Sequence, residues 1–145
     1  MGFETNFLKG WATYLATAGV GVYSTTDPYQ PTDVAITFTA LPQDPDNAIA
    51  LGMYTVSDDP TLSDSVLALQ VYSRAAGPDP TAVEDIGAAV YEQLQGLSNI
   101  TLATGVKVLQ VVRQGGGSLG RDENQRWERS DNYYVTVHRP SLRRQ

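Results

Sequence analysis

The chain has 145 residues, of which 41% are apolar and 18% charged, and it contains no cysteine and a single histidine. A chain of this length buries roughly 70% of its unfolded surface as one domain, and this composition excludes disulfides, cysteine nucleophiles, and thiolate or multi-histidine metal sites. The net charge of -6 argues against a general nucleic-acid binder.

The charges are divided unevenly along the chain. Residues 1–73 carry eight acids and one base, a net charge of -7, whereas residues 74–145 carry nine bases and eight acids, a net charge of +1. An acidic flank and an arginine-bearing flank would let copies of the chain meet head to tail. Charge alone, however, favours the simpler interpretation of an unevenly charged solvated surface.

The first predicted element is an amphipathic helix. Apolar residues recur at helical spacing from Phe3 to Leu15, and Gly19 and Gly21 follow where a helix would end. The alternating residues Asp33–Thr39 predict a half-buried strand.

Two further strands are predicted on either side of an acidic turn. A rigid acidic loop, residues 41–47, precedes Ala48–Val56, which is apolar on both faces and therefore predicts a central strand or one covered by a partner. Ser57–Asp64 is a second acidic loop, and Ser65–Arg74 is the next strand.

The second predicted helix has the clearest boundaries in the sequence. Asp79 is placed as its N-cap, with Pro80 at the first helical position, and Gly96 closes it. Its apolar stripe runs from Val83 to Leu94, and Gly87 would allow close approach to a sheet.

Two final strands, Val106–Arg113 and Trp127–Arg139, flank the glycine-rich segment Gln114–Gln125. We expect this segment to be a mobile loop that orders only against a neighbour. A short basic tail, Ser141–Gln145, follows Pro140. The expected fold is α+β: a single domain, 1–145, with a mixed, mostly antiparallel sheet of about five strands packed by an N-terminal and a central helix.

One glycine motif has the letters of a dinucleotide-binding fingerprint. Gly115–Gly120 follows a strand, but a charged turn and another strand come next instead of the helix that would hold a pyrophosphate. A hairpin loop is the better interpretation, and no cofactor is expected.

The acidic residues and the histidine do not form a recognisable metal or catalytic site in the sequence. The acids of the two loops lack the glycine and terminal glutamate of a calcium loop, so we expect solvated turns and no metal; these acids are Asp44, Asp46, Asp58, Asp59 and Asp64. His138, three residues before Ser141, could belong to a small hydrolase, but a lone strand histidine is more often a surface or interface residue. We expect no catalytic residues.

Targeting signals are not apparent. The first residues lack the basic start and apolar run of a signal peptide, and no window approaches the roughly 18 apolar residues of a membrane span. We therefore expect no membrane association.

Several passages, in their order and spacing, resemble one protein family. They are Tyr14-Leu15, Gly19–Tyr23, the loop Leu41–Asp46, the strand Leu69–Arg74, and the Gly-Arg-Asp passage at residues 120–122 leading into Asn132-Tyr133-Tyr134. Together they resemble the tail terminator proteins, or minor capsid proteins, of long-tailed bacteriophages, particularly phages of actinobacteria. The resemblance covers essentially the whole chain.

The resemblance implies a structural virion protein and not an enzyme. It implies a homo-oligomer, a hexameric ring, that caps the tail tube, stops its elongation and offers a surface for head attachment. Its partners would be the tail tube protein and the head-tail connector or stopper protein, and DNA would pass through the lumen without specific binding. It would be assembled in the host cytoplasm and reside in the virion, at the head-proximal end of the tail. The alternatives are a head-completion or stopper protein of the neck and, from a different class, the hydrolase using His138.

The arginines near the Gly-Arg-Asp passage are the candidate interface residues. We expect exposed arginines here to meet acids of an adjacent subunit or ring, because bidentate arginine pairs fix orientation and register. The candidate subunit or ring interface consists of Arg113, Arg121, Asp122, Arg126, Arg129, Asp44 and Asp46.

Overall fold

The computed structural model describes residues 2–144 and contains two helices and six strands. In chain order they are α1 (Phe3–Thr17), β1 (Ala35–Phe38), β2 (Ala48–Asp58), β3 (Asp64–Ala75), α2 (Thr81–Leu94), β4 (Ser98–Thr101), β5 (Lys107–Arg121) and β6 (Trp127–His138).

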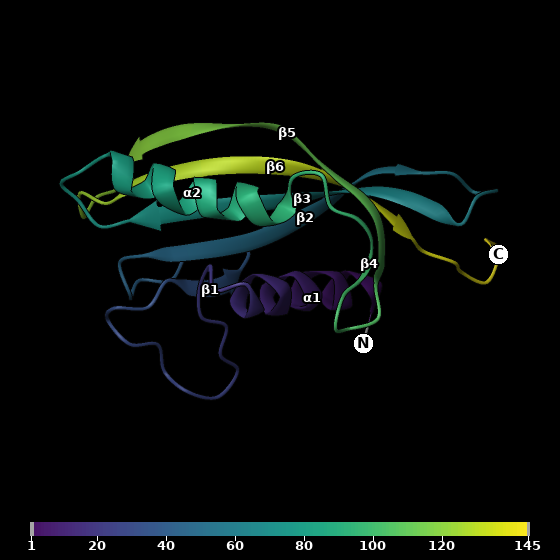
Figure 1. Ribbon diagram of the computed structural model, residues 1–145, viewed down its shortest axis with the longest axis horizontal. Helices are drawn as coiled ribbons and strands as arrows, with labels where there is room; N and C mark the ends of the chain where they lie inside the picture. Colours follow the sequence, from purple (N-terminus) through teal and green to yellow (C-terminus); the bar gives the residue numbers. More distant parts are fainter. Residues whose placement is uncertain (1, 145) are drawn as a thin grey trace.

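All six strands form one curled sheet in the order β1-β2-β3-β6-β5-β4 (Figure 1). Only β1 and β2 are parallel, and the other neighbours are antiparallel. The centre is the long ladder between β3 and β6, which runs from Asp64 opposite His138 to Ala75 opposite Trp127. The α+β prediction is confirmed, with six strands instead of about five.

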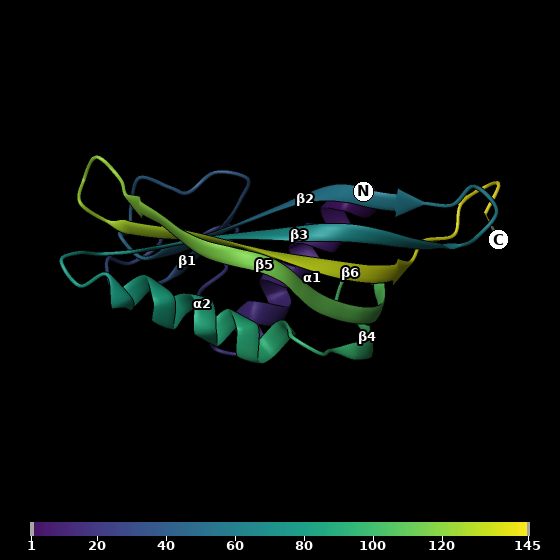
Figure 2. The ribbon, with the colours of Figure 1, turned by 90° about the horizontal axis from the view of Figure 1, so that it is seen from above.

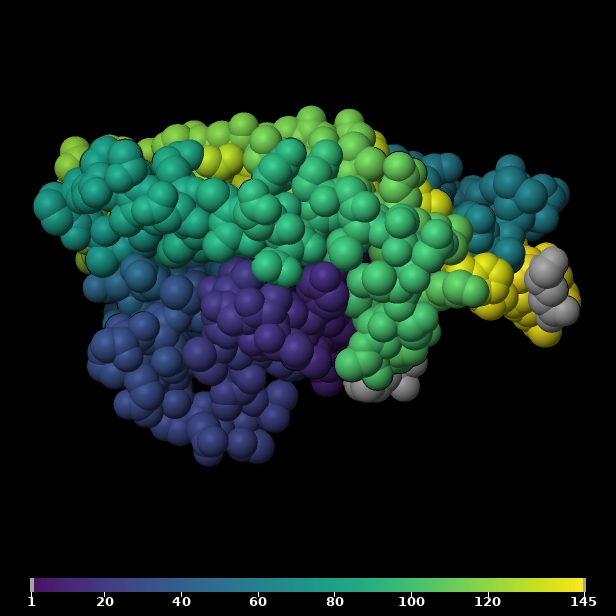
Figure 3. All heavy atoms as spheres, viewed as in Figure 1, coloured from purple at the N-terminus to yellow at the C-terminus, as the bar shows by residue number. Residues whose placement is uncertain are grey.

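Both helices lie on one side of the molecule (Figure 3), and their apolar stripes join one core with the sheet. Trp11 of α1 and Leu94 of α2 are fully buried in this core together with alternate strand residues such as Leu69 and Val135. The intervening residues, Tyr72 and Tyr134 among them, lie on the opposite face, where no helix packs among the described residues.

The predicted first strands are confirmed, but β2 is buried over only part of its length. Ala48–Leu51 are buried, whereas the strand is exposed from Tyr54 onward. The burial of β2 ends here because its neighbour β1 is short and pairs only with these first four residues. The central-strand interpretation is therefore confirmed only for Ala48–Leu51, and coverage of the remaining residues by a partner stays a prediction.

The start of α2 is formed as its residues predict, with a shift of one position. The helix begins at Thr81, and the Asp79 carboxylate accepts hydrogen bonds from the Thr81 backbone N–H at 2.9 Å and from its hydroxyl at 2.8 Å. Gly96, with φ +82°, closes the helix as expected, because this backbone conformation favours glycine.

The prediction of a loop over Gln114–Gln125 is wrong for residues 114–121, and only residues 122–125 form the turn of the hairpin. Residues 114–121 continue β5, and they pair with β6 from Gly115 opposite Asn132 to Arg121 opposite Trp127, with one register shift between Ser118 and Gly120. Backbone hydrogen bonds to β6 hold a strand that the glycines by themselves do not favour. The short β4, Ser98–Thr101, also escaped the sequence pattern.

The two long hairpins extend the molecule in opposite directions (Figure 2). The β5–β6 hairpin lies at one end, and the β2–β3 hairpin lies at the other beside the C-terminal segment. That segment is fastened there: Arg139 N–H donates to the Ser63 carbonyl at 2.6 Å, and the Arg144 guanidinium donates to the Asp64 carbonyl at 2.7 Å. Residues 141–144 of the basic tail are thus part of the folded domain.

Candidate subunit interface

The turn between β5 and β6 places Arg126 against the acidic loop 41–47. The Asp122 carboxylate accepts the backbone N–H groups of Asn124 and Arg126 at 2.9 Å each, which closes the turn. The Arg126 guanidinium then donates to Asp122 at 2.8 Å and to the Gln43 carbonyl at 2.7 Å, and it lies 3.4 Å from Asp46. Loop and hairpin are therefore held together within one chain.

Burial and hydrogen bonding shift the pKa values of Asp122 and Arg126 in opposite directions. Burial alone would raise the pKa of Asp122, but the hydrogen bonds from Arg126 and Asn124 outweigh it and hold that pKa below its ordinary value. Burial likewise opposes the charge on Arg126, whereas Asp122 and Asp46 favour it, and the pKa of Arg126 is raised. Both groups are therefore stabilised in their charged forms.

Arg74, at the end of β3, is a second anchor of the same loop, and it is not among the candidate residues predicted from the sequence. The side chain is only 3% exposed and donates to the carbonyls of Pro45 and Asp46, each at 2.8 Å. Burial lowers its pKa. An arginine at the end of an apolar strand, facing a proline-rich loop, is the signal that could have found it.

A second ion network lies beneath α2. Asp131 of β6 is 1% exposed and accepts a bidentate pair from Arg129, with distances of 2.9 and 2.8 Å. Arg129 also pairs with Glu84 of α2, and the hydrogen bonds to Asp131 raise its pKa. Arg113 lies 3.8 Å from Asp131 and stacks its guanidinium over the Tyr91 ring at 4.4 Å.

Two glycines make room for this network. A Cβ at Gly87 would lie 2.7 Å from Cδ of Arg129, and a Cβ at Gly116 would lie 1.8 Å from Asp131 Oδ1. Gly87 thus permits close approach to the sheet as predicted, with the Arg129 side chain as the group that it accommodates.

The candidate interface residues divide into two groups. The expectation of exposed arginines is wrong for Arg126, which is 8% exposed, and for Arg129, whose side chain is 12% exposed, because each finds carboxylate partners in its own chain. Arg121, Asp44 and Asp46 are exposed.

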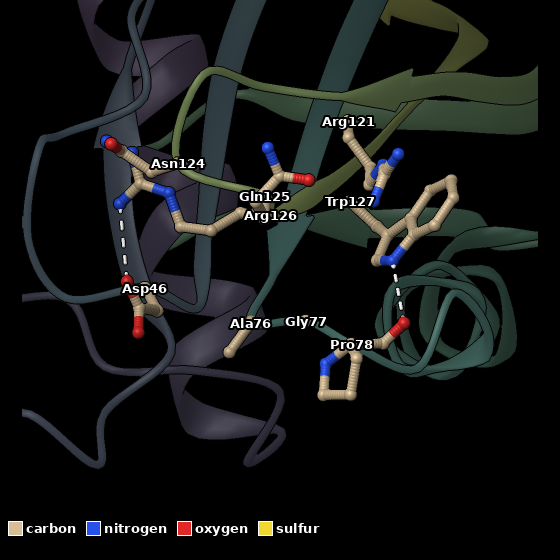
Figure 4. Close-up of a pocket in the computed structure, with 9 residues that line it drawn as sticks. All are labelled: Asp46, Ala76, Gly77, Pro78, Arg121, Asn124, Gln125, Arg126 and Trp127. Carbon is tan, nitrogen blue, oxygen red and sulfur yellow. Dashed lines mark hydrogen bonds and ion pairs between the residues drawn. The ribbon is translucent and has the colours of Figure 1, made fainter.

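A pocket of about 420 Å³ separates the β5–β6 turn from the segment before α2 (Figure 4). The Trp127 indole N–H donates to the Pro78 carbonyl at 3.1 Å across it, and the Arg121 guanidinium lies 5.3 Å from the centre of the Trp127 ring. Asp46 lines the same pocket opposite Arg121. Exposed cationic, aromatic and acidic groups are thus gathered at this end of the molecule.

The charge division of the sequence is also a division of the sheet. Strands β1, β2 and β3 come from the first part of the chain and occupy one side of the sheet, and β6, β5 and β4 occupy the other. Ion pairs cross the boundary, at 2.8 Å between Arg139 and Glu4 and at 3.6 Å between Arg144 and Asp58. The acidic side is therefore partly neutralised within the molecule.

The other chemical motifs have structural settings of their own. His138 is exposed and its Nδ1 lies 3.3 Å from Asp64, while the Ser141 backbone N–H donates to the Arg144 carbonyl at 2.9 Å. The glycine motif lies in β5 and leads into a turn and β6. Within residues 2–144, no group of three or more acidic, histidine or cysteine residues could hold a metal ion. None of the helices in this part of the chain has the length and apolar character needed to span a membrane.

Comparisons with known proteins agree with this architecture. The chain resembles one in a solved structure titled "Virion of native gene transfer agent (GTA) particle", with 15% identity, 87% of this chain and 84% of that chain covered, and a TM-score of 0.57, which shows a shared fold. No curated protein matches the sequence significantly. The model of the family described as "Bacteriophage tail terminator protein" matches residues 14–139, and this span includes all six strands and α2. The chain therefore belongs to the bacteriophage tail terminator family and is a structural protein of the virion.

Proposed function

We propose that this protein forms a hexameric ring that caps the tail tube, stops its elongation and provides the surface to which the head attaches. The family match over residues 14–139 carries the proposal, because it spans the whole sheet and not one motif. Each ring of a tube exposes the same upper surface, so growth continues until a ring of matching symmetry covers it and presents a different surface.

The charge of the chain fits a ring around a DNA channel. Six copies at -6 each would carry a formal charge of -36. Phosphate contacts supply most non-specific affinity for DNA, so an acidic lumen would let DNA pass without binding.

The exposed candidate residues support the proposed contact between copies or rings. Arg121 and the acids Asp44 and Asp46 lie at the end formed by the β5–β6 hairpin, where their exposed side chains would be within reach of charged groups of a neighbour. Arg113, Asp122, Arg126 and Arg129 would support this contact by fixing the hairpin and loop beneath it.

The test uses a phage that encodes this chain. With the chain deleted, we expect tubes of heterogeneous and excessive length and unattached heads. Tails of normal length that fail to join heads would contradict the proposal and point to a stopper of the neck.

A charge reversal probes the contact surface. Arg121→Glu should leave the monomer folded, because exposed substitutions usually change stability by about 0.5 kcal/mol or less, and it should impair ring assembly or capping. Arg143→Glu, at an exposed site in the C-terminal segment, is the matched control. Normal assembly of the Arg121 variant would remove this residue from the interface.

A further inference from the structure

Two strands of the sheet have a free edge along part of their length. β1 covers β2 only to Leu51, so Gly52–Asp58 pair on one side only, with β3. On the other side of the sheet, β4 and the residues before it form backbone hydrogen bonds with β5 as far as Val111. The Gln95 side chain accepts the Arg113 backbone N–H. After Arg113, the described residues of β5 pair only with β6. A free edge presents unpaired N–H and C=O groups to any strand of matching direction.

The regular parts of the two edges have the same length. In β2, Gly52–Thr55 lies between the end of the pairing with β1 and a register shift between Thr55 and Ser57. In β5, Gly115–Ser118 lies between two register shifts. Each segment has four residues. Both lie in strands that continue past their covering neighbour: β2 runs on beyond β1, and β5 runs on beyond β4.

These edges are interrupted by register shifts but carry exposed apolar side chains. Residues 52–58 and 114–121 contain no proline and no lysine, the residues that commonly blunt an edge. Tyr54 is 42% exposed, Val56 38% and Leu119 59%, and they are three of the six large apolar side chains exposed in the described part of the chain. Exposed apolar groups beside unpaired backbone indicate a surface that is covered in the assembly.

We propose that the Gly52–Thr55 edge of one copy pairs with the Gly115–Ser118 edge of the next copy, so that the sheet continues from subunit to subunit; this rests on the ring proposed above. The two segments are offset by one residue from a flush register, which places Tyr54 opposite Gly115 or Gly117 and keeps the helix-free faces on one side. β2 and β5 run in opposite directions within the sheet, so copies in the same orientation meet with antiparallel strands. This direction brings the acidic end of β2, Asp58 and Asp59, toward the Arg113 end of the glycine segment.

The arrangement explains why assembly would end in a ring. Each copy has one edge of each kind, so the contact is heterologous, and any open row leaves one edge of each kind uncovered. Only closure covers them all. Gly115 and Gly117 leave this edge open to a neighbouring strand, because they carry no side chain and a Cβ at either position would meet nothing within 4 Å.

Paired cysteines test the proposal, since the chain has none of its own. Tyr54→Cys is combined with Gly115→Cys or with Gly117→Cys; all three positions lie on the helix-free face, and the two combinations sample two registers. β3 and β6 separate β2 from β5, so the two cysteines of one molecule are at least about 14 Å apart and cannot join. Oxidation of assembled protein should therefore give a ladder of covalent oligomers.

Tyr54→Cys with Ser118→Cys is the matched control, because a shift of one residue moves the second sulfur to the helix-covered face. We expect this variant to form no ladder. Wild-type rings seen by negative-stain microscopy, together with double variants that assemble but stay uncrosslinked, would overturn the edge pairing and leave the ring intact. Equal crosslinking of the control would also overturn it. Failure of the wild type to form rings, alone and on tail tubes, would overturn both proposals.

Discussion

Gly116 of β5 lies directly against the carboxylate of Asp131 on β6: a Cβ at position 116 would be 1.8 Å from Oδ1 and 3.0 Å from the Ser130 carbonyl. No side chain fits there unless Asp131 moves, and Asp131 is held by a bidentate bond from Arg129. One glycine of the run is therefore required by a buried ion network, and its neighbours are not.

Gly116→Ala is expected to destabilise the protein by about 1–3 kcal/mol, the usual cost of overpacking. Gly117→Ala is the control in the same strand, since its Cβ would meet nothing within 4 Å, and it should change stability by about 0.5 kcal/mol or less. Urea unfolding followed by circular dichroism measures both. Equal midpoints for the two variants would contradict the assigned role of Gly116.

Arg126→Gln is expected to loosen the loop 41–47. The substitution removes the charged bonds to Asp122 and to the Gln43 carbonyl, and hydrogen bonds to charged groups contribute roughly 1.5–3 kcal/mol each. Amide exchange in the loop should accelerate and the unfolding midpoint should fall. Arg121→Gln, whose side chain is exposed, should do neither. Unchanged exchange in the Arg126 variant would show that Arg74 alone holds the loop.

Because Tyr133 is buried, we expect the free energy of unfolding to fall at high pH. Its side chain is fully buried, its hydroxyl has no hydrogen-bond partner among the described residues, and burial raises its pKa to about 12 from an ordinary 10. The unfolded chain releases this proton first, so the contribution is present below pH 10 and is lost as pH rises toward 12. A shift of this size corresponds to roughly 2–3 kcal/mol.

Tyr133→Phe should remove that dependence. At neutral pH the variant should be as stable as the wild type or more so, because it deletes a buried hydroxyl without a partner. Between pH 10 and 12 it should lose less stability than the wild type in urea titrations. Parallel losses in the two proteins would assign the alkaline transition to another group.

Arg144→Ala is expected to release the C-terminal segment from the β2–β3 hairpin. The guanidinium donates to the Asp64 carbonyl at 2.7 Å and to the Ser65 hydroxyl at 2.9 Å, and it pairs with Asp58. We expect faster amide exchange in residues 59–65 and a fall in global stability of about 1–3 kcal/mol, because the Arg144 side chain is only 11% exposed and its hydrogen bonds are charged. Arg143→Ala is the matched control. Unchanged exchange in the Arg144 variant would show that the segment is held by its backbone alone.

The sequence by itself determined the elements whose signals are local. The helical spacing from Phe3 to Leu15 and the Asp79 carboxylate before α2 depend on neighbours a few residues away, and both are formed as predicted. Strand alternation likewise placed β3 and β6, and the order of elements gave the α+β class. The resemblance in residue order gave the family, which the match over residues 14–139 confirms.

Only the tertiary structure decided the parts that depend on distant residues. Gln114–Arg121 is a strand because β6 supplies hydrogen-bond partners that glycine-rich sequence cannot predict. Arg126 and Arg129 have carboxylate partners nearby in sequence, Asp122 and Asp131, but they are enclosed because the loop 41–47 and α2, remote in sequence, pack against them. A charged side chain in a sequence looks exposed until its partner is known, and the partner is fixed by the packing of the whole sheet.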